Sequence, residues 1–221
     1  MKKFILTITM FACTLALFAQ SEKYKSAMKD KIAALDTTRD VTGLKDLSAS
    51  FERIGDAEKT QWLPYYYAGL AQMNAANFIY SANASNPSEL KNLDALADKA
   101  EQMIAKAEAL SKNNSEIYVV KKMVASSRMM VDPMNRYMTY GPPAQEALET
   151  ARKLNPQNPR IYLLEGQDKF FTPEQYGGSK AEAKKLFEEA VKKYESFKPA
   201  SELDPNWGRA TVEYFLSQIK S

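Results

Sequence analysis

The sequence contains no histidine, and its single cysteine, Cys13, lies close to the N-terminus. A chain that loses this N-terminal part has no disulfide, no thiolate or imidazole zinc site, no cysteine nucleophile and no histidine general base. Glycine is scarce, with 8 residues among 221, and no long stretch alternates apolar and polar residues as strands do. We therefore expect a helical protein that is not an enzyme and holds no cofactor or metal ion.

The first nineteen residues have the pattern of a cleaved signal peptide. Lys2 and Lys3 precede an uncharged apolar stretch over residues 4–18, and Ala19 is a small residue suited to cleavage. Cleavage after Ala19 is favoured over cleavage after Gln20. The apolar stretch is shorter than the roughly 20 residues that span a bilayer, so an uncleaved anchor is disfavoured and no membrane span is expected after cleavage.

The remaining residues, 20–221, are expected to form one domain with little net charge. The formal net charge of the chain is +3, and loss of Lys2 and Lys3, with no acidic residue in the signal, leaves +1. Acidic and basic residues interleave as they do on solvated helix faces, and no basic cluster with aromatic residues stands out. The sequence thus predicts a periplasmic or secreted domain that does not bind nucleic acid.

Turn-forming residues divide this domain into helices of about 12 to 20 residues. Alanine and straight-chain residues, which favour helix, predominate between the turns. Ser179 and Glu182 have the spacing of a capping box, Asn158 precedes Pro159 as an N-cap does, and Ser115 is a further candidate cap. The expected turns lie at residues 40–43, 83–88, 112–115, 141–143, 155–159, 176–179 and 198–206, with a first helix over 21–35 and a last helix over 207–219.

A pattern of small, large and small residues recurs along the chain. The three clearest examples are Ala100-Ile104-Ala107, Ala144-Leu148-Ala151 and Ala183-Phe187-Ala190, and Leu47-Phe51-Ile54 is a weaker fourth. In chain order the first three triplets end at Ile54, Ala107 and Ala151. A tyrosine lies 11 positions after each of these residues, at Tyr65, Tyr118 and Tyr162. Gly69 and Gly166 each follow such a tyrosine by four positions, where two helices can approach closely.

This set resembles the tetratricopeptide repeat family, in which an aromatic residue and a glycine on one helix precede a small-large-small triplet on the next. The resemblance implies an all-α, tetratricopeptide-like α-solenoid of about three to four helix pairs with a C-terminal capping helix. The tyrosines are 53 and 44 positions apart, against about 34 in the standard repeat. We expect the additional residues, within 74–92, 132–143 and 172–179, to form loops.

The resemblance also implies a concave binding face, lined by positions that flank the aromatic and glycine residues. These positions are mainly apolar, which suits a partner protein or an extended peptide. They are Leu63, Tyr66, Leu70, Met73, Glu116, Val119, Met123, Ser126, Arg160, Leu163, Gln167 and Phe170. The alternative is that the inserted segments or terminal helices fold over this face and bury it.

Two other readings have a weaker basis in the sequence. The segment over residues 171–178 loosely resembles helical partners of periplasmic solute transporters, so a soluble small-molecule-binding subunit of such a system is the second functional hypothesis. Met123, Met129, Met130, Met134 and Met138, with tyrosines among them, form a biased segment. Thioethers bind cuprous ions, but we interpret this segment as adaptable packing because no histidine or cysteine accompanies it.

Overall fold

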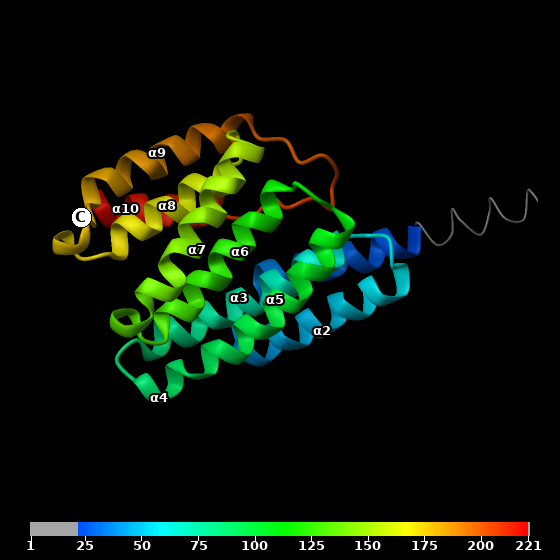
Figure 1. Cartoon of the computed structure of the whole chain (residues 1–221). Coiled ribbons are helices and arrows are strands. Elements are labelled where there is room, and N and C mark those ends of the chain that lie inside the picture. The colour runs from blue at the N-terminus through cyan, green and yellow to red at the C-terminus, as the bar shows by residue number, and fades with distance from the viewer. Residues whose placement is uncertain (1–21, 221) are drawn as a thin grey trace, which may run out of the picture.

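The computed structural model describes residues 22–220 and is helical throughout, with no strand among those residues (Figure 1). The all-α prediction is therefore confirmed, whereas the predicted signal peptide lies outside the described residues. A helical segment over residues 22–37 comes first. The elements that follow are α2 (Val41–Glu58), α3 (Leu63–Asn83), α4 (Pro87–Leu90), α5 (Asn92–Leu110), α6 (Ser115–Met130), α7 (Pro133–Leu154), α8 (Pro159–Phe171), the 3₁₀ turn η1 (Glu174–Tyr176), α9 (Lys180–Ser196) and α10 (Arg209–Lys220).

The long helices pack mainly against their neighbours in the chain. The closest pairs are α2 with α3, α3 with α5, α6 with α7, and α8 with α9, while α7 and α8 touch over a much shorter stretch. α3 also contacts α6 directly. An ion pair between Lys122 and Asp168 links α6 to α8, and ring contacts of Phe170 with Phe215 link α8 to α10. Alternate helices α3, α6, α8 and α10 thus form a connected row.

Small residues allow the helices of each pair to approach closely. Ala107, Ala151 and Ala190 are fully buried, as their positions in the triplets predicted. A Cβ atom on Gly69 would lie 2.9 Å from Ile104, and one on Gly166 would lie 2.5 Å from the Phe187 ring. Both glycines therefore occupy helix contacts that leave no space for a side chain, as expected.

The predicted caps are confirmed at two helices and shifted at a third. The Ser179 hydroxyl accepts from the Glu182 N–H at 3.2 Å, and the Asn158 side chain accepts from the Arg160 N–H at 3.1 Å. At α6 the N-cap is Asn114, whereas Ser115 lies within the helix and donates to the Ala151 carbonyl at 2.9 Å. Ser115 was therefore wrongly predicted as the cap, because an asparagine one position earlier fills that role.

The expected loops are for the most part helical. α3 continues to Asn83 and α7 starts at Pro133, so residues 74–83 and 133–143 extend helices, contrary to expectation. α7 also runs through Pro142 and Pro143, where a break was predicted. The tertiary context overrides the local preference of proline, although neither proline can donate the usual hydrogen bond. Residues 172–179 do form a turn, which contains η1.

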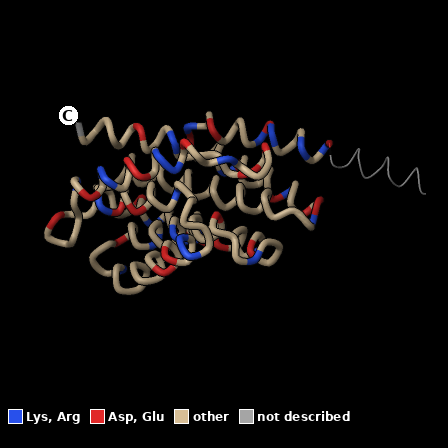
Figure 2. Tube along the Cα trace, turned by 90° about the horizontal axis from the view of Figure 1, so that it is seen from above, with Lys and Arg blue, Asp and Glu red and all other residues tan. Residues whose placement is uncertain are grey.

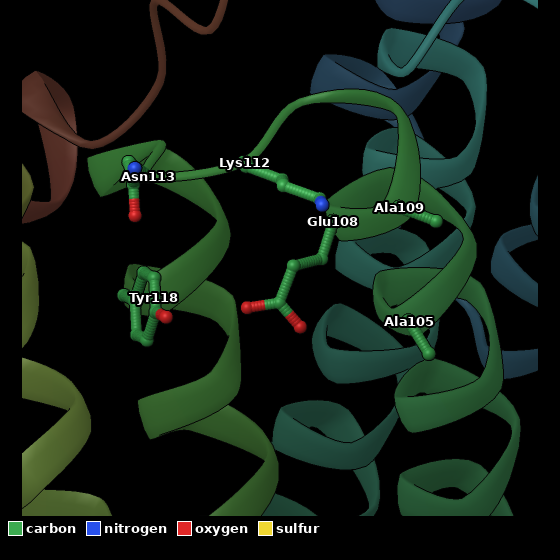
Figure 3. A pocket seen from close by; sticks show the side chains of 6 residues that line it. All are labelled: Ala105, Glu108, Ala109, Lys112, Asn113 and Tyr118. Carbon is green, nitrogen blue, oxygen red and sulfur yellow. The ribbon is translucent and has the colours of Figure 1, made fainter.

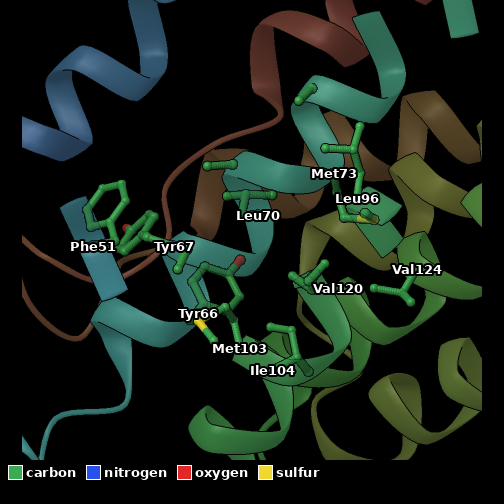
Figure 4. Close-up of a cluster of buried hydrophobic side chains, with 14 of the residues drawn as sticks. Phe51, Tyr66, Tyr67, Leu70, Met73, Leu96, Met103, Ile104, Val120 and Val124 are labelled. Carbon is green, nitrogen blue, oxygen red and sulfur yellow. The ribbon is translucent and has the colours of Figure 1, made fainter. Parts of the chain in front are cut away.

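The segment between α9 and α10, residues 197–208, is here called the strap. In Figure 1 it leaves α9, extends along the upper edge of the molecule and returns to α10. Leu203 packs into the main core, parts of which are shown in Figure 4, and Trp207 packs against this core and two smaller clusters around α8 and α9. The strap therefore ties the first helices to the last ones.

Candidate functional site

The structure buries most of the residues that the sequence assigned to an open concave face. Leu63, Tyr66, Leu70 and Met73 of α3 are buried. The same holds for Val119 of α6 and for Arg160 and Leu163 of α8, whereas Met123, Gln167 and Phe170 are partly exposed. Glu116 and Ser126 are also partly exposed. The expectation that these positions form an open apolar groove is thus wrong for seven of the twelve, and partner binding through the other five stays a prediction.

The strap accounts for part of this burial, and packing of α3 against α5 and α6 accounts for Leu70 and Met73. The Tyr67 hydroxyl donates to the Leu203 carbonyl at 2.8 Å, and the Trp207 indole N–H donates to the Tyr66 hydroxyl at 2.8 Å. The Tyr194 hydroxyl donates to the Trp207 carbonyl at 2.8 Å. A segment of the chain itself therefore covers the N-terminal end of α3, and it also contacts Arg160 near the start of α8.

A buried ion pair lies beneath the strap. The Arg160 guanidinium donates from Nε and Nη2 to the two carboxylate oxygens of Glu116, at 2.7 and 2.5 Å. Asn158 donates to the same carboxylate at 2.9 Å, and the Trp207 ring lies 5.6 Å from the guanidinium. Burial alone would lower the pKa of Arg160, but the Glu116 carboxylate raises it above its ordinary value. The pair is structural, because its groups are saturated by each other.

The first half of α7 carries three highly exposed apolar side chains. Met134, Tyr137 and Met138 are 79%, 60% and 80% exposed. Their spacing places them on one side of the helix, and we call this surface the methionine–tyrosine face. Large apolar side chains grouped in this way on a protein surface usually mark a contact site.

The two halves of α7 pack differently on either side of its proline pair. After Pro143, the helix buries Ala144, Ala147, Leu148 and Ala151, whereas residues before Pro142 bury little. The first half is held by Arg136, which donates to both carboxylate oxygens of Asp94 on α5, at 2.7 and 2.9 Å. No acidic residue occurs over residues 133–145. The methionine–tyrosine face is thus apolar and free of carboxylates on its own helix segment, and Arg136 of this segment is paired with Asp94.

A second exposed aromatic surface lies where the end of α8 meets the middle of α10. Phe171 and Tyr214 are each 59% exposed, and Tyr176 of η1 is also exposed. Unlike the side chains on α7, these rings already pack on others, since Phe171 and Tyr214 both contact Phe215 edge to face at 5.5 Å. Part of their apolar area is therefore used within the fold.

A polar pocket of about 420 Å³ opens between the end of α5 and the start of α6 (Figure 3). Glu108, Lys112, Asn113 and Tyr118 line it. The Glu108 carboxylate accepts from Lys121 at 2.6 Å, and the Lys121 ammonium lies 4.7 Å from the centre of the Tyr118 ring. The Glu108 carboxylate and the Lys121 ammonium thus already pair with each other, and the residues that line the pocket indicate no particular ligand.

The remaining surface offers little for metal or charge recognition. Within residues 22–220 no group of three or more acidic, histidine or cysteine side chains is placed to hold a metal ion. Lysines, arginines and carboxylates alternate along the helices in Figure 2 without a side of single sign. The methionine–tyrosine face was missed at the sequence level because its methionines were interpreted as packing. The composition of the segment was the available signal.

No helix in the described part of the chain is both long enough and apolar enough to cross a membrane. No family model matches the sequence, and a search of curated proteins found no match. Among solved structures, the chain is similar to the HusA haemophore from Porphyromonas gingivalis. The two sequences are 35% identical, the match covers 89% of this chain and 92% of the haemophore, and the TM-score is 0.75. The chain therefore belongs to the same family as this haemophore.

Proposed function

We propose that this chain is an extracellular or envelope-associated protein that binds haem. The observation that carries the proposal is the 35% identity to a haemophore over nearly the whole of both chains. The composition of the chain agrees with a carrier and not an enzyme, since histidine is absent and Cys13 is the single cysteine. A haem carrier needs an apolar contact surface for the porphyrin, and the structure offers candidates for it.

The methionine–tyrosine face is the surface that fits a porphyrin best. A porphyrin is flat, apolar on both faces and larger than one side chain, so it requires several apolar groups on one rigid side of the protein. Met134, Tyr137 and Met138 meet this requirement from a single helix and remain highly exposed. The anionic propionates of haem would meet no carboxylate over residues 133–145, where Arg136 is already paired with Asp94.

Contacts with the porphyrin ring supply most of the affinity in this proposal. Haem iron is held in proteins by histidine, cysteinate, methionine or tyrosine, and the described residues offer only the last two. A neutral thioether is a weak ligand for ferric iron, and Tyr137 is the one tyrosine on the face. We therefore expect protoporphyrin IX without iron to bind within about tenfold of haem, about 1.4 kcal/mol.

The test is a titration of the purified chain with haemin, followed through the Soret absorbance. The triple variant Met134→Gln, Tyr137→Gln and Met138→Gln keeps good helix-forming residues at all three positions. It should lose at least about tenfold in affinity, since each buried apolar side chain contributes about 1.5 kcal/mol or more. The matched control Phe171→Gln and Tyr214→Gln alters the second aromatic surface and should bind haemin like the parent.

Two results would contradict this proposal at different levels. A parent chain that leaves the Soret band unchanged at micromolar haemin does not bind haem, and the function is then wrong. Equal losses of haemin affinity in the control and the triple variant, or a loss in the control alone, would place the site at the second aromatic surface. Circular dichroism of each variant shows whether the helices are retained.

The architecture and the export of the chain belong to the same proposal. The tetratricopeptide-type α-solenoid is supported by the buried triplet alanines and by the tight contacts at Gly69 and Gly166. Export through a signal over residues 1–19 is supported by the sequence pattern and by the relation to a haemophore. A small-molecule ligand fits the second functional hypothesis, while association with a transporter through residues 171–178 stays a prediction.

A further inference from the structure

The methionines of the described chain differ sharply in exposure. Met134 and Met138 are 79% and 80% exposed, whereas Met28, Met73 and Met103 are almost completely buried. The methionines between these extremes, Met123, Met129 and Met130, are partly buried. Oxidants in solution therefore reach the two α7 thioethers first, because methionine oxidation follows access to the sulfur.

We propose that Met134 and Met138 form a peroxide-sensitive modification site, and that their oxidation in the ligand-free chain weakens haem binding at the methionine–tyrosine face. This inference rests on the proposed function. In each oxidation the thioether sulfur attacks one oxygen of hydrogen peroxide, the O–O bond breaks, an S–O bond forms, and water leaves after proton transfer. The sulfur is oxidised to a sulfoxide and the peroxide is reduced to water.

The geometry explains why this modification acts on binding and not on folding. Met134 and Met138 are four positions apart on one side of α7 and lie on either side of Tyr137, so two sulfoxides place polar oxygens across the whole face. A sulfoxide is polar where a thioether is apolar. Neither side chain belongs to the buried core, so their oxidation leaves the packing of α5, α6 and α7 unchanged.

The experiment treats the ligand-free chain with a low dose of hydrogen peroxide, removes the peroxide with catalase, and locates the sulfoxides by peptide mass mapping. Haemin titrations of treated and untreated protein are then compared. We expect sulfoxides at Met134 and Met138 before any other methionine, a loss of affinity of about tenfold or more, and a melting temperature that stays within a few degrees. Reduction by methionine sulfoxide reductases of both epimer specificities should restore binding.

Two double variants separate the site from general oxidation. Met134→Leu with Met138→Leu removes both sulfurs, so its affinity after peroxide should equal its own affinity before peroxide. Met129→Leu with Met130→Leu keeps the exposed pair and should lose affinity as the parent does. The haemin affinity of each protein after peroxide is compared with its affinity before peroxide. The ratio of the two affinities is then independent of any change that the leucines themselves cause.

The outcomes distinguish this inference from the function on which it rests. Untreated parent protein that does not bind haemin overturns both. Untreated protein that binds haemin, with full affinity retained when both sulfoxides are present, overturns the inference alone. A Met134→Leu, Met138→Leu variant that loses affinity after peroxide as strongly as the parent, or mapping in which other methionines react first, also overturns it.

Discussion

Phe187 of α9 packs directly against the backbone of α8 at Gly166. Its side chain is fully buried and stacks on Phe215 with ring centres 5.1 Å apart. The ring lies so close to Gly166 that a Cβ there would be 2.5 Å from it. Phe187 thus holds α8, α9 and α10 together from one position.

Replacing Phe187 by alanine should lower the free energy of unfolding by about 3 to 5 kcal/mol, as for other large aromatic truncations in cores. Gly166→Ala should destabilise as well, by about 1 to 3 kcal/mol, because the added methyl group overpacks the same contact. Urea unfolding followed by circular dichroism measures both losses. A loss below about 1 kcal/mol for Phe187→Ala would mean that the ring is not a core contact.

Substitutions in the ion pair of Arg160 and Glu116 should change stability through charge and not through packing. Glu116→Gln leaves a fully buried guanidinium without its counter-charge and should destabilise the fold by about 3 to 5 kcal/mol. The double variant Arg160→Met and Glu116→Leu removes both charges and should recover much of this loss. Denaturant unfolding of the single and double variants checks this. If the double variant is as unstable as Glu116→Gln, the damage comes from lost packing and not from an unpaired charge.

The sequence alone predicts the burial of Phe187 but not the pairing of Arg160 with Glu116. Phe187 was expected to be buried because it is the large member of a regular triplet. The spacing of Arg160 and Glu116, 44 positions apart, gives no indication that they pair. Their burial depends on Trp207, which is further still along the chain, so local periodicity could only place them on a helix face.

At the scale of elements, helix starts were more predictable than helix lengths. A cap is a local arrangement of a side-chain acceptor and a nearby N–H, so Asn158 and Ser179 could be identified from a few residues. Proline and glycine are also local signals, but their effect depends on the surrounding packing. The anchoring of Arg136 on Asp94 holds the first half of α7 in place, and α7 therefore continues through the proline pair.

The two confirmed caps should differ in strength because of their surroundings. Ser179→Ala removes an exposed cap and should destabilise the fold by about 1 kcal/mol. Asn158 is fully buried and also donates to Ser115 and Glu116, so Asn158→Ala should lower stability by about 2 to 4 kcal/mol. Thermal and urea unfolding of the two variants provide the comparison. Equal losses would show that the additional hydrogen bonds of Asn158 contribute nothing.

For the whole molecule, buried tyrosines predict instability in alkali. Burial raises the pKa of Tyr24 to about 12, and burial also raises the pKa values of Tyr66, Tyr67 and Tyr194 above the ordinary value of 10.0. Above pH 10 these groups ionise in the unfolded chain while they stay protonated in the folded one. The unfolded state then binds fewer protons, so stability falls as pH rises.

The stability from these tyrosines should be fully present below pH 10 and should decline by up to about 1.4 kcal/mol per pH unit for each tyrosine above it. Tyr67→Phe should make the decline less steep, although it also removes the hydrogen bond to the Leu203 carbonyl. Urea unfolding at successive pH values, with tyrosinate absorbance as a second probe, measures both effects. A free energy of unfolding that stays constant from pH 10 to about pH 12 would contradict this prediction.

The candidate site was less predictable than the fold, for a physical reason. Periodicity shows which residues share a side of a helix, but it does not show which side another segment covers. The strap and the packing between helices cover most of the side that was expected to be open, and α7 leaves Met134, Tyr137 and Met138 exposed. Both facts follow from contacts between distant parts of the chain, which a single sequence does not reveal.

The strap also changes how the chain can acquire its structure. Stacked repeats normally contact only adjacent repeats, so they can fold one after another and fray from either end. Here Glu202 pairs with Lys29 at 2.6 Å, and Leu203 and Trp207 contact Tyr67 and Tyr66. The early helices therefore lack this cover until residues 197–208 have been synthesised. Deletion of residues 197–208 should expose core far away at α3, so the strap couples the early and late helices into one cooperative unit.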